Sequence, residues 1–176
     1  MAGGRRGALL LLDFQEDFLD PDGRMPVAGE QVQPVITAAG QAVAGAHADG
    51  DLVIRIGNEF RWSDLIGNLF RRHAAMRGST GAAWDSRIDP PGALYISKWK
   101  SNAFCNPELA AVLQEAGVER VRLAGLYTKA CVSATERAAQ KRGLSVQVLG
   151  SPTACTSDTS RQKALDRLRR IGIEVL

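Results

Sequence analysis

The chain has few of the residues that build disulfide frameworks, metal centres and membrane spans. Its 176 residues include three cysteines and two histidines, with no Cys-x-x-Cys pair, and His47 and His73 lie far apart. An odd number of widely spaced cysteines does not predict a disulfide framework, and two distant histidines do not predict a zinc site. The apolar run at residues 8–12 is too short for a signal-peptide core or a membrane span. We therefore expect a protein of the reducing cytoplasm with no membrane partner.

Blocks of charge of one sign are also missing. The chain has 22 basic and 19 acidic residues, a net charge of +3, and its basic residues are scattered in short pairs. Proteins that bind nucleic acids usually concentrate basic residues on one face, so we expect no nucleic-acid partner. A composition of 45% hydrophobic and 23% charged residues is that of an ordinary globular protein. At this length, residues 1–176 are expected to form a single domain with its own core.

Patterns typical of strands and helices alternate along the chain. Strands are expected at residues 8–12, 52–56, 93–97, 121–126, 144–149 and 173–176, and helices at residues 30–49, 107–117, 128–142 and 159–170. Repeated strand–helix–strand units predict a doubly wound α/β domain, with a six-stranded, mostly parallel sheet and helices on both faces. The irregular stretch 57–89 carries several large apolar residues, and we expect it to pack over a pocket or a neighbouring subunit.

Three ionisable residues stand at or near the ends of expected strands. Asp13 follows the run ALLLL, Lys98 follows ALYIS, and Cys131 comes shortly after VRLAGLY. Ligands of open parallel sheets bind beyond the carboxyl ends of the strands, so these three residues are expected to meet in one cleft. If Thr128 caps the following helix, Cys131 is its third residue, where free amides and the helix dipole favour negative charge. We expect these amides and Lys98 to lower the pKa of the thiol, against the opposing charge of Asp13.

These residue types favour nucleophilic catalysis without a histidine. Cys131 would attack a carbonyl carbon, Asp13 would carry the proton from the thiol to the leaving group, and Lys98 would polarise the pair. Taken alone, each residue also has a structural explanation, as a buried core cysteine, a solvated lysine and a turn aspartate. Cys105 and Cys155 do not follow a strand end with a recognisable helix start, and we expect them to be structural.

The same segments resemble the motifs of the isochorismatase-like cysteine hydrolase family, which includes nicotinamidases and other small amidases. LLLLDFQEDF resembles the segment with the catalytic aspartate, here Asp13; SKWKSNAF resembles the lysine motif, here Lys98; and AGLYTKACVSAT resembles the nucleophile turn, here Cys131. Weaker matches at DGRMPV, GSTGAAW and SRQKALDRLRRIG extend the resemblance over nearly the whole chain. The resemblance implies a six-stranded parallel sheet and a homodimer or homotetramer.

The resemblance also implies how the site is completed. It implies a cis peptide bond at Leu126–Tyr127, which would aim the backbone amides of Tyr127 and Cys131 at the oxyanion of a tetrahedral intermediate. We further expect four aromatic residues in the wall of the substrate pocket, although a hydrophobic core would equally explain them: Phe18, Phe60, Trp62 and Tyr127.

The chain departs from the nicotinamidase pattern after the second expected strand. Nicotinamidases carry an aspartate and histidines there that bind a metal, whereas this chain reads IRIGNEFRW, with Asn58 and Phe60 at the corresponding places. We therefore expect no metal and no other cofactor. True isochorismatases typically lack the cysteine, so Cys131 favours acyl transfer. The expected activity is hydrolysis of an amide, carbamoyl or imide-like C–N bond of a small molecule through a thioester.

Two alternatives remain open. One is an isochorismatase-type hydrolase of an enol ether, which would need Asp13 but not Cys131. The other is a catalytically silent member of the fold that acts only through interactions.

Overall fold

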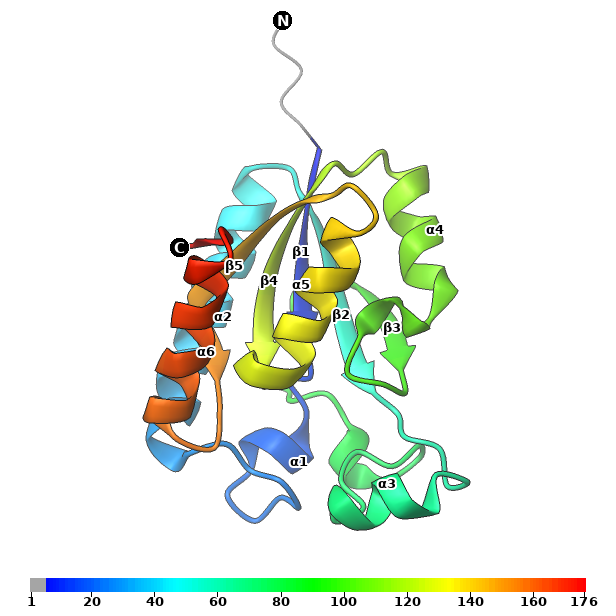
Figure 1. Cartoon of the computed structure of the whole chain (residues 1–176). Helices are drawn as coiled ribbons and strands as arrows, with labels where there is room; N and C mark the ends of the chain where they lie inside the picture. The colour runs from blue at the N-terminus through cyan, green and yellow to red at the C-terminus, as the bar shows by residue number, and fades with distance from the viewer. Residues whose placement is uncertain (1–5) are drawn as a thin grey trace, which may run out of the picture.

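Six parallel strands form one sheet at the centre of the computed structural model, which describes residues 6–176 (Figure 1). The strand order is β3-β2-β1-β4-β5-β6, so the chain first builds one side of the sheet from β1 and then returns to build the other. This confirms the expected α/β fold. The strands are β1 (Gly7–Leu12), β2 (Leu52–Asn58), β3 (Leu94–Lys98), β4 (Arg120–Leu126), β5 (Ser145–Ala154) and β6 (Glu174–Val175).

The helices cover both faces of the sheet and enclose two hydrophobic layers. In β1, Leu9 and Leu11 belong to the layer under α2 (Gly29–Ala48), whereas Leu10 and Leu12 belong to the opposite layer. That second layer lies under three helices: α4 (Pro107–Glu115), α5 (Ser133–Gln140) and α6 (Asp158–Arg170). Every residue of β1 is buried, which explains why its sequence is apolar without alternation.

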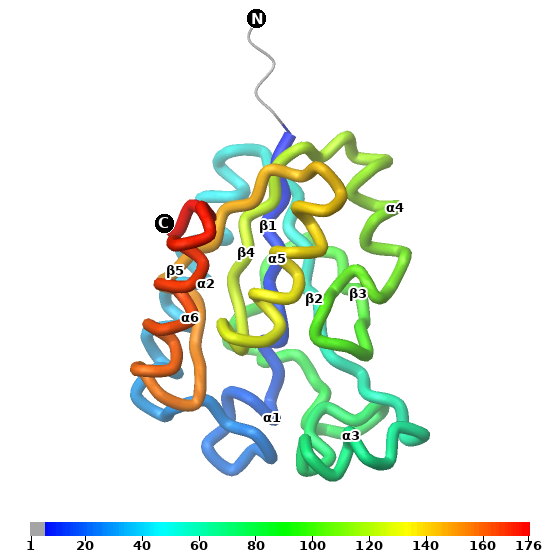
Figure 2. Tube along the Cα trace, in the orientation of Figure 1, coloured from blue at the N-terminus to red at the C-terminus, as the bar shows by residue number. Residues whose placement is uncertain are grey.

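Short helices and loops gather beyond the carboxyl ends of the strands. They include α1 (Glu16–Leu19), α3 (Leu65–Phe70), η1 (Thr80–Ala82) and η2 (Ala103–Cys105). The tube view shows the chain around α1 and α3 below the sheet, at the edge where β1 and β2 end (Figure 2). The order of strands reverses between β1 and β4, and such a reversal is where open α/β sheets bind their ligands.

The structure differs from the expected elements in several places, among them α3 and η1, which lie in the stretch 57–89 that was expected to be irregular. The expected helix 128–142 begins with a π turn, η3 (Thr128–Val132), before α5 starts at Ser133. β5 continues to Ala154, beyond the expected end at residue 149. The short helix α1 was not expected from the sequence, because four residues give no readable helical period. Within residues 6–176, no helix is both long enough and apolar enough to span a bilayer.

Candidate active site

Asp13 is the first residue beyond β1, and the chain changes direction there. Its φ is 61°, in the left-handed region that aspartate tolerates better than bulkier residues, and its backbone amide donates to the carbonyl of Ile56 on β2 at 2.8 Å. The side chain is buried. Its carboxylate pairs with Lys98 and also interacts with the thiol of Cys131 and the backbone of Asn58, so it lies next to the proton that it would accept.

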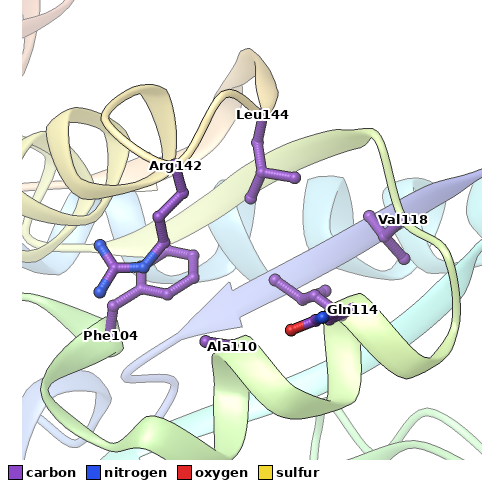
Figure 3. Close-up of a pocket in the computed structure, with 7 residues that line it drawn as sticks. Phe104, Ala110, Gln114, Val118, Arg142 and Leu144 are labelled. Atoms are coloured by element: carbon purple, nitrogen blue, oxygen red, sulfur yellow. The ribbon is translucent and has the colours of Figure 1, made fainter.

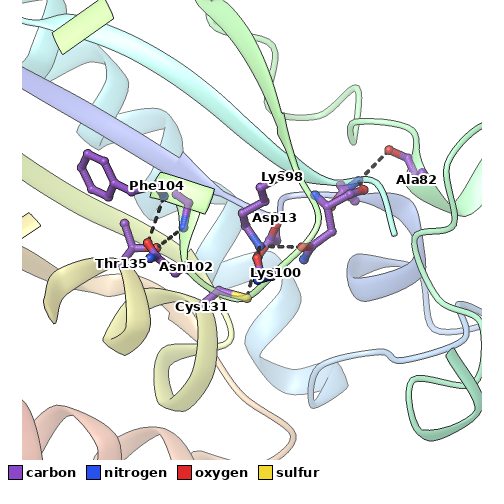
Figure 4. Close-up of polar contacts among 11 residues, drawn as sticks. Asp13, Ala82, Lys98, Lys100, Asn102, Phe104, Cys131 and Thr135 are labelled. Atoms are coloured by element: carbon purple, nitrogen blue, oxygen red, sulfur yellow. Dashed lines mark hydrogen bonds and ion pairs between the residues drawn. The ribbon is translucent and has the colours of Figure 1, made fainter. Parts of the chain in front are cut away.

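Lys98 ends β3 and brings an ammonium group into the interior. Its Nζ lies 3.0 Å from Oδ2 of Asp13 and donates to Oδ1 of Asn58 at 2.6 Å and to the carbonyl of Lys100 at 3.2 Å. The same nitrogen lies 3.4 Å from the sulfur of Cys131. Figure 4 shows the lysine between the aspartate and the cysteine. Burying a lysine is tolerated only when its charge is paired and its donors are satisfied, and both conditions are met here.

Cys131 is carried by the turn that follows β4. It is the fourth residue of η3, and Thr128 does not cap the helix as expected, because its hydroxyl donates to the carbonyl of Ala154 instead. Gly125 has a φ of 141°, and a Cβ there would overlap the carbonyl oxygen of Leu12, so only glycine lets the end of β4 lie this close to β1. The peptide bond Leu126–Tyr127 is cis.

The three ionisable side chains shift one another's pKa. Burial raises the pKa of Cys131 to about 12, and the charge of Asp13 adds to this more than Lys98 offsets it. The expected lowering of this pKa is therefore wrong, because the cost of burying a thiolate beside a carboxylate exceeds the stabilisation by Lys98. Burial also raises the pKa of Asp13, although Lys98 acts against it. Burial alone would lower the pKa of Lys98, but Asp13 and Cys131 hold it above its usual value.

A small cavity opens onto this cluster. Its volume is about 180 Å³, and its walls are mostly apolar. Phe18, Phe60 and Tyr127 line it, as expected, together with Asp13 and Cys131. Trp62 does not line it: this side chain is 60% exposed, and its indole nitrogen donates to the carbonyl of Arg77. The expectation that Trp62 forms part of the wall is thus not met within a single chain.

Other residues complete the wall of the cavity without a signal in the sequence. The guanidinium group of Arg71 lies 3.9 Å from the centre of the Phe60 ring, a contact between two parts of the segment that connects β2 and β3. The hydroxyl of Tyr127 donates to the carbonyl of Met25. The ring of Tyr127 packs edge-on against the ring of Phe18, with 5.8 Å between the ring centres. The remaining lining residues that the sequence did not mark are Met25, Asn58, Arg71, Ser101, Leu126 and Ala130.

The residues around the cavity do not fit a metal ion. Asn58 offers an amide oxygen in place of a carboxylate, and that oxygen already accepts from Lys98. Phe60 has no atom that could bind a metal, and the positively charged guanidinium group of Arg71 lies over its ring. Across residues 6–176, no group of three or more His, Cys, Asp or Glu side chains is placed to hold a metal.

A larger groove of about 370 Å³ lies elsewhere, between α4 and the chain that follows α5 (Figure 3). The guanidinium group of Arg142 stacks over the ring of Phe104 in this groove, at 4.5 Å from the ring centre. Its remaining lining residues are Ala110, Leu113, Gln114, Val118 and Leu144. None of these is a nucleophile or a general base, whereas the smaller cavity is lined by both Asp13 and Cys131 and is therefore the candidate active site.

Comparison with known proteins agrees with this fold. A pyrazinamidase of Pyrococcus horikoshii, solved in complex with zinc, is similar at 25% identity over 97% of this chain and 98% of that one, with a TM-score of 0.85. A nicotinamidase/pyrazinamidase from Bacillus subtilis is similar at 22% identity over 97% and 98%, with a TM-score of 0.85. An N-carbamoylsarcosine amidase from Thermoplasma acidophilum is similar at 22% identity over 97% and 95%, with a TM-score of 0.82.

The comparison with family models assigns the chain more directly. The model described as the isochorismatase domain matches residues 7–176, which include β1, β3 and the turn that carries Cys131. The chain therefore belongs to the isochorismatase family of hydrolases.

Proposed function

We propose that this protein is a cysteine-dependent hydrolase of C–N bonds in small molecules, acting on an amide, carbamoyl or imide-like group through a thioester on Cys131. The main support is a cluster of three buried side chains that are in contact beside the cavity. The ammonium nitrogen of Lys98 lies 3.0 Å from the carboxylate of Asp13 and 3.4 Å from the sulfur of Cys131. A nucleophile, a base and a fixed cation within reach of one another are the set that acyl transfer needs.

In the first half of the reaction, Cys131 attacks the carbonyl carbon of the substrate. With a pKa of about 12, the thiol is neutral at physiological pH, so its proton passes to Asp13 as the C–S bond forms. Burial raises the pKa of Asp13, which makes its carboxylate a stronger base than an exposed one. The backbone amides of Tyr127 and Cys131 hold the oxyanion. Asp13 then protonates the leaving nitrogen, and the C–N bond breaks.

In the second half, water resolves the thioester. Asp13, again a carboxylate, takes a proton from the water as its oxygen attacks the carbonyl carbon. The C–S bond breaks, the sulfur recovers the proton from Asp13, and the acid product leaves. Lys98 stays protonated throughout, because its pKa is held above the usual value, and its charge offsets the negative charge that moves between sulfur and carboxylate.

The shape of the cavity limits the substrate. Pockets for drug-sized ligands have volumes of about 300–1,000 Å³, whereas this one measures about 180 Å³. Its aromatic walls suit a small, flat or apolar group next to the reacting carbonyl. The names of two similar structures, nicotinamidase and N-carbamoylsarcosine amidase, are in keeping with amide and carbamoyl substrates of this size.

The proposed reaction does not use a metal. Asn58, the residue at the place of the nicotinamidase aspartate, is engaged as a hydrogen-bond acceptor for Lys98, and Phe60 serves as cavity wall. Both residues thus have roles in the proposed site that a metal ligand could not share.

An activity screen with two variants tests the proposal. Purified protein is offered small primary amides, N-carbamoyl compounds, cyclic imides and isochorismate, and ammonia or acid release is measured. We expect turnover of a C–N substrate that is lost in both Asp13→Asn and Cys131→Ala. Turnover of isochorismate that survives in Cys131→Ala would instead identify an enol-ether hydrolase. No turnover of any of these compounds, with no acyl adduct on Cys131, would favour a silent member of the fold.

A further inference from the structure

The short helix α3 has its polar and apolar sides reversed. Its one buried residue is Asn68, whereas its apolar residues point to solvent. A surface helix normally turns its apolar side toward the core. We call the exposed apolar residues of α3, with the neighbouring tryptophan, the α3 patch: Trp62 (60% exposed), Leu65 (76%), Ile66 (75%), Leu69 (71%) and Phe70 (81%).

Hydrogen bonds hold α3 in this orientation. The amide nitrogen of Asn68 donates to the carbonyl of Arg61 at 2.9 Å, and its amide oxygen accepts from Arg71 at 2.8 Å. Asp64 caps the start of the helix, because its carboxylate accepts from the amide of Gly67 at 3.2 Å. Rotating the helix to bury its apolar side would break the bond from Asn68 to Arg61 and the contact of Arg71 with the ring of Phe60. The orientation that exposes these apolar residues is thus fixed by contacts within the chain.

The α3 patch is large for a surface that stays in water. A single aromatic side chain presents about 150–250 Å², so five large side chains at these exposures form an apolar face on the order of 600 Å². That is at the upper limit for one patch on a monomer, about 300–600 Å². It approaches the share of one partner in a stable interface, about 800 Å².

The charges at the two ends of α3 identify the partner. Asp64 lies exposed at the start of the helix, where it also pairs with Arg71 of its own chain, and Arg72 lies exposed just beyond the end. The six-residue helix between them is about 9 Å long. When two α3 helices pack antiparallel about a two-fold axis, Asp64 of each copy lies near Arg72 of the other. The apolar residues between them then pack against the same residues of the other copy. A surface of this pattern is complementary to itself.

We propose that the α3 patch is an isologous interface between two copies of this chain, with the two α3 helices packed antiparallel. The interface lies next to the candidate active site. Phe60 precedes the patch and Arg71 follows it, and both line the cavity. Figure 1 places α3 at the edge of the molecule where the strands end. A partner on α3 therefore holds in place the segment that forms one wall of the cavity.

Sedimentation equilibrium of the purified chain and of two variants tests the interface. Wild type is expected at twice the chain mass of 18.9 kDa. Leu69→Glu places a charge in the centre of the patch and is expected to raise the dimer dissociation constant by about 100-fold or more. Ile171→Glu is the matched control, because Ile171 is an apolar residue of similar exposure (56%) that lies after α6, far from α3 in the chain. It is expected to leave the dimer intact.

Arg72→Glu tests the antiparallel arrangement. The substitution places a second negative charge opposite Asp64 of the partner subunit, and we expect the dimer to weaken by about 10-fold. Arg170→Glu, an exposed site at the end of α6, is the control. Circular dichroism checks that each variant is folded. If Leu69→Glu disrupts the dimer while Arg72→Glu leaves it unchanged, the antiparallel pairing is wrong.

Two results would overturn the proposal as a whole. One is a wild-type chain of single mass at every concentration, and the other is a Leu69→Glu dimer as stable as wild type. Vesicles of anionic phospholipid serve as a further probe. A monomeric wild type that sediments with them, and a Leu69→Glu variant that does not, would assign the patch to a membrane surface instead. None of these readouts depends on catalytic activity, so the interface and the proposed function can fail separately.

Discussion

The ammonium nitrogen of Lys98 lies 3.0 Å from a carboxylate oxygen of Asp13, in an ion pair whose two side chains are 0% and 1% exposed. A buried ion pair gives little net stability, because the cost of removing both charges from water offsets their attraction. An apolar pair of the same volume would serve the fold as well. The retention of both charges beside a thiol therefore fits a chemical role better than a structural one.

Replacing Lys98 by methionine is expected to destabilise the fold in a pH-dependent way. At pH 7 the variant leaves the Asp13 carboxylate buried and unpaired, which costs about 3–5 kcal/mol in the free energy of unfolding. Without the cation the pKa of Asp13 rises further, so lowering the pH protonates the carboxyl group and recovers part of the loss. Urea denaturation at pH 7 and pH 5 measures this. The double variant with Asp13→Asn should also recover stability; an equal loss at both pH values without such recovery would contradict the buried ion pair.

The pH dependence of turnover is expected to report Asp13. The carboxyl group must be ionised to accept the thiol proton, and burial raises its pKa. Activity should therefore fall on the acid side at a pH above the ordinary aspartate value of about 3.9. The pH profile of kcat/KM for the substrate found in the screen measures this. An acidic limb at or below the ordinary value would mean that Asp13 is not the base.

The thiols should differ in reactivity, and Cys131 should not react first, contrary to the low pKa that the sequence predicts for it. Cys131 is buried with a pKa of about 12, so little thiolate exists at neutral pH. Cys105 is only partly buried and should react first with limiting iodoacetamide. Labelling of Cys131 should accelerate as the pH rises above 9. Peptide mapping by mass spectrometry measures both rates, and preferential labelling of Cys131 at pH 7 would show that its pKa is low.

Turnover is expected to survive exhaustive chelation. The resemblance places Asn58 and Phe60 at the positions of nicotinamidase metal ligands, and in this structure both are engaged in contacts of their own. Activity is measured after prolonged dialysis against dipicolinate and compared with samples supplemented with zinc, iron or manganese. Loss of activity on dialysis and its return with one of these metals would refute the metal-free reaction.

The sequence predicted the site residues that stand at the ends of strands. It did not predict those that come from loops far apart in the chain. Asp13 and Lys98 could be found because each ends an apolar run, and parallel strands bring such ends together. The walls contributed by Met25 and Arg71 could not be found, since they depend on how the loops after β1 and β2 fold over the sheet. Trp62 was misplaced for the same reason.

The turn after β4 shows a second limit of the sequence. Thr128 has the residue type of a helix cap, but the neighbouring β5 offers its hydroxyl the carbonyl of Ala154. A tertiary contact thus overrides the local preference, and a π turn replaces the expected start of an α-helix. The pKa of Cys131 was misjudged because the sequence gives the neighbouring charges but not the depth of burial.

The covalent intermediate is the most direct test of the proposed function. Wild-type protein turning over its substrate is quenched in acid within milliseconds to seconds, and the intact mass and the peptide masses are measured. We predict an added acyl mass on the peptide that contains Cys131, and its accumulation in wild type but not in Cys131→Ala, which should not turn over at all. Turnover by Cys131→Ala at the wild-type rate, with no adduct on any cysteine, would contradict catalysis through Cys131.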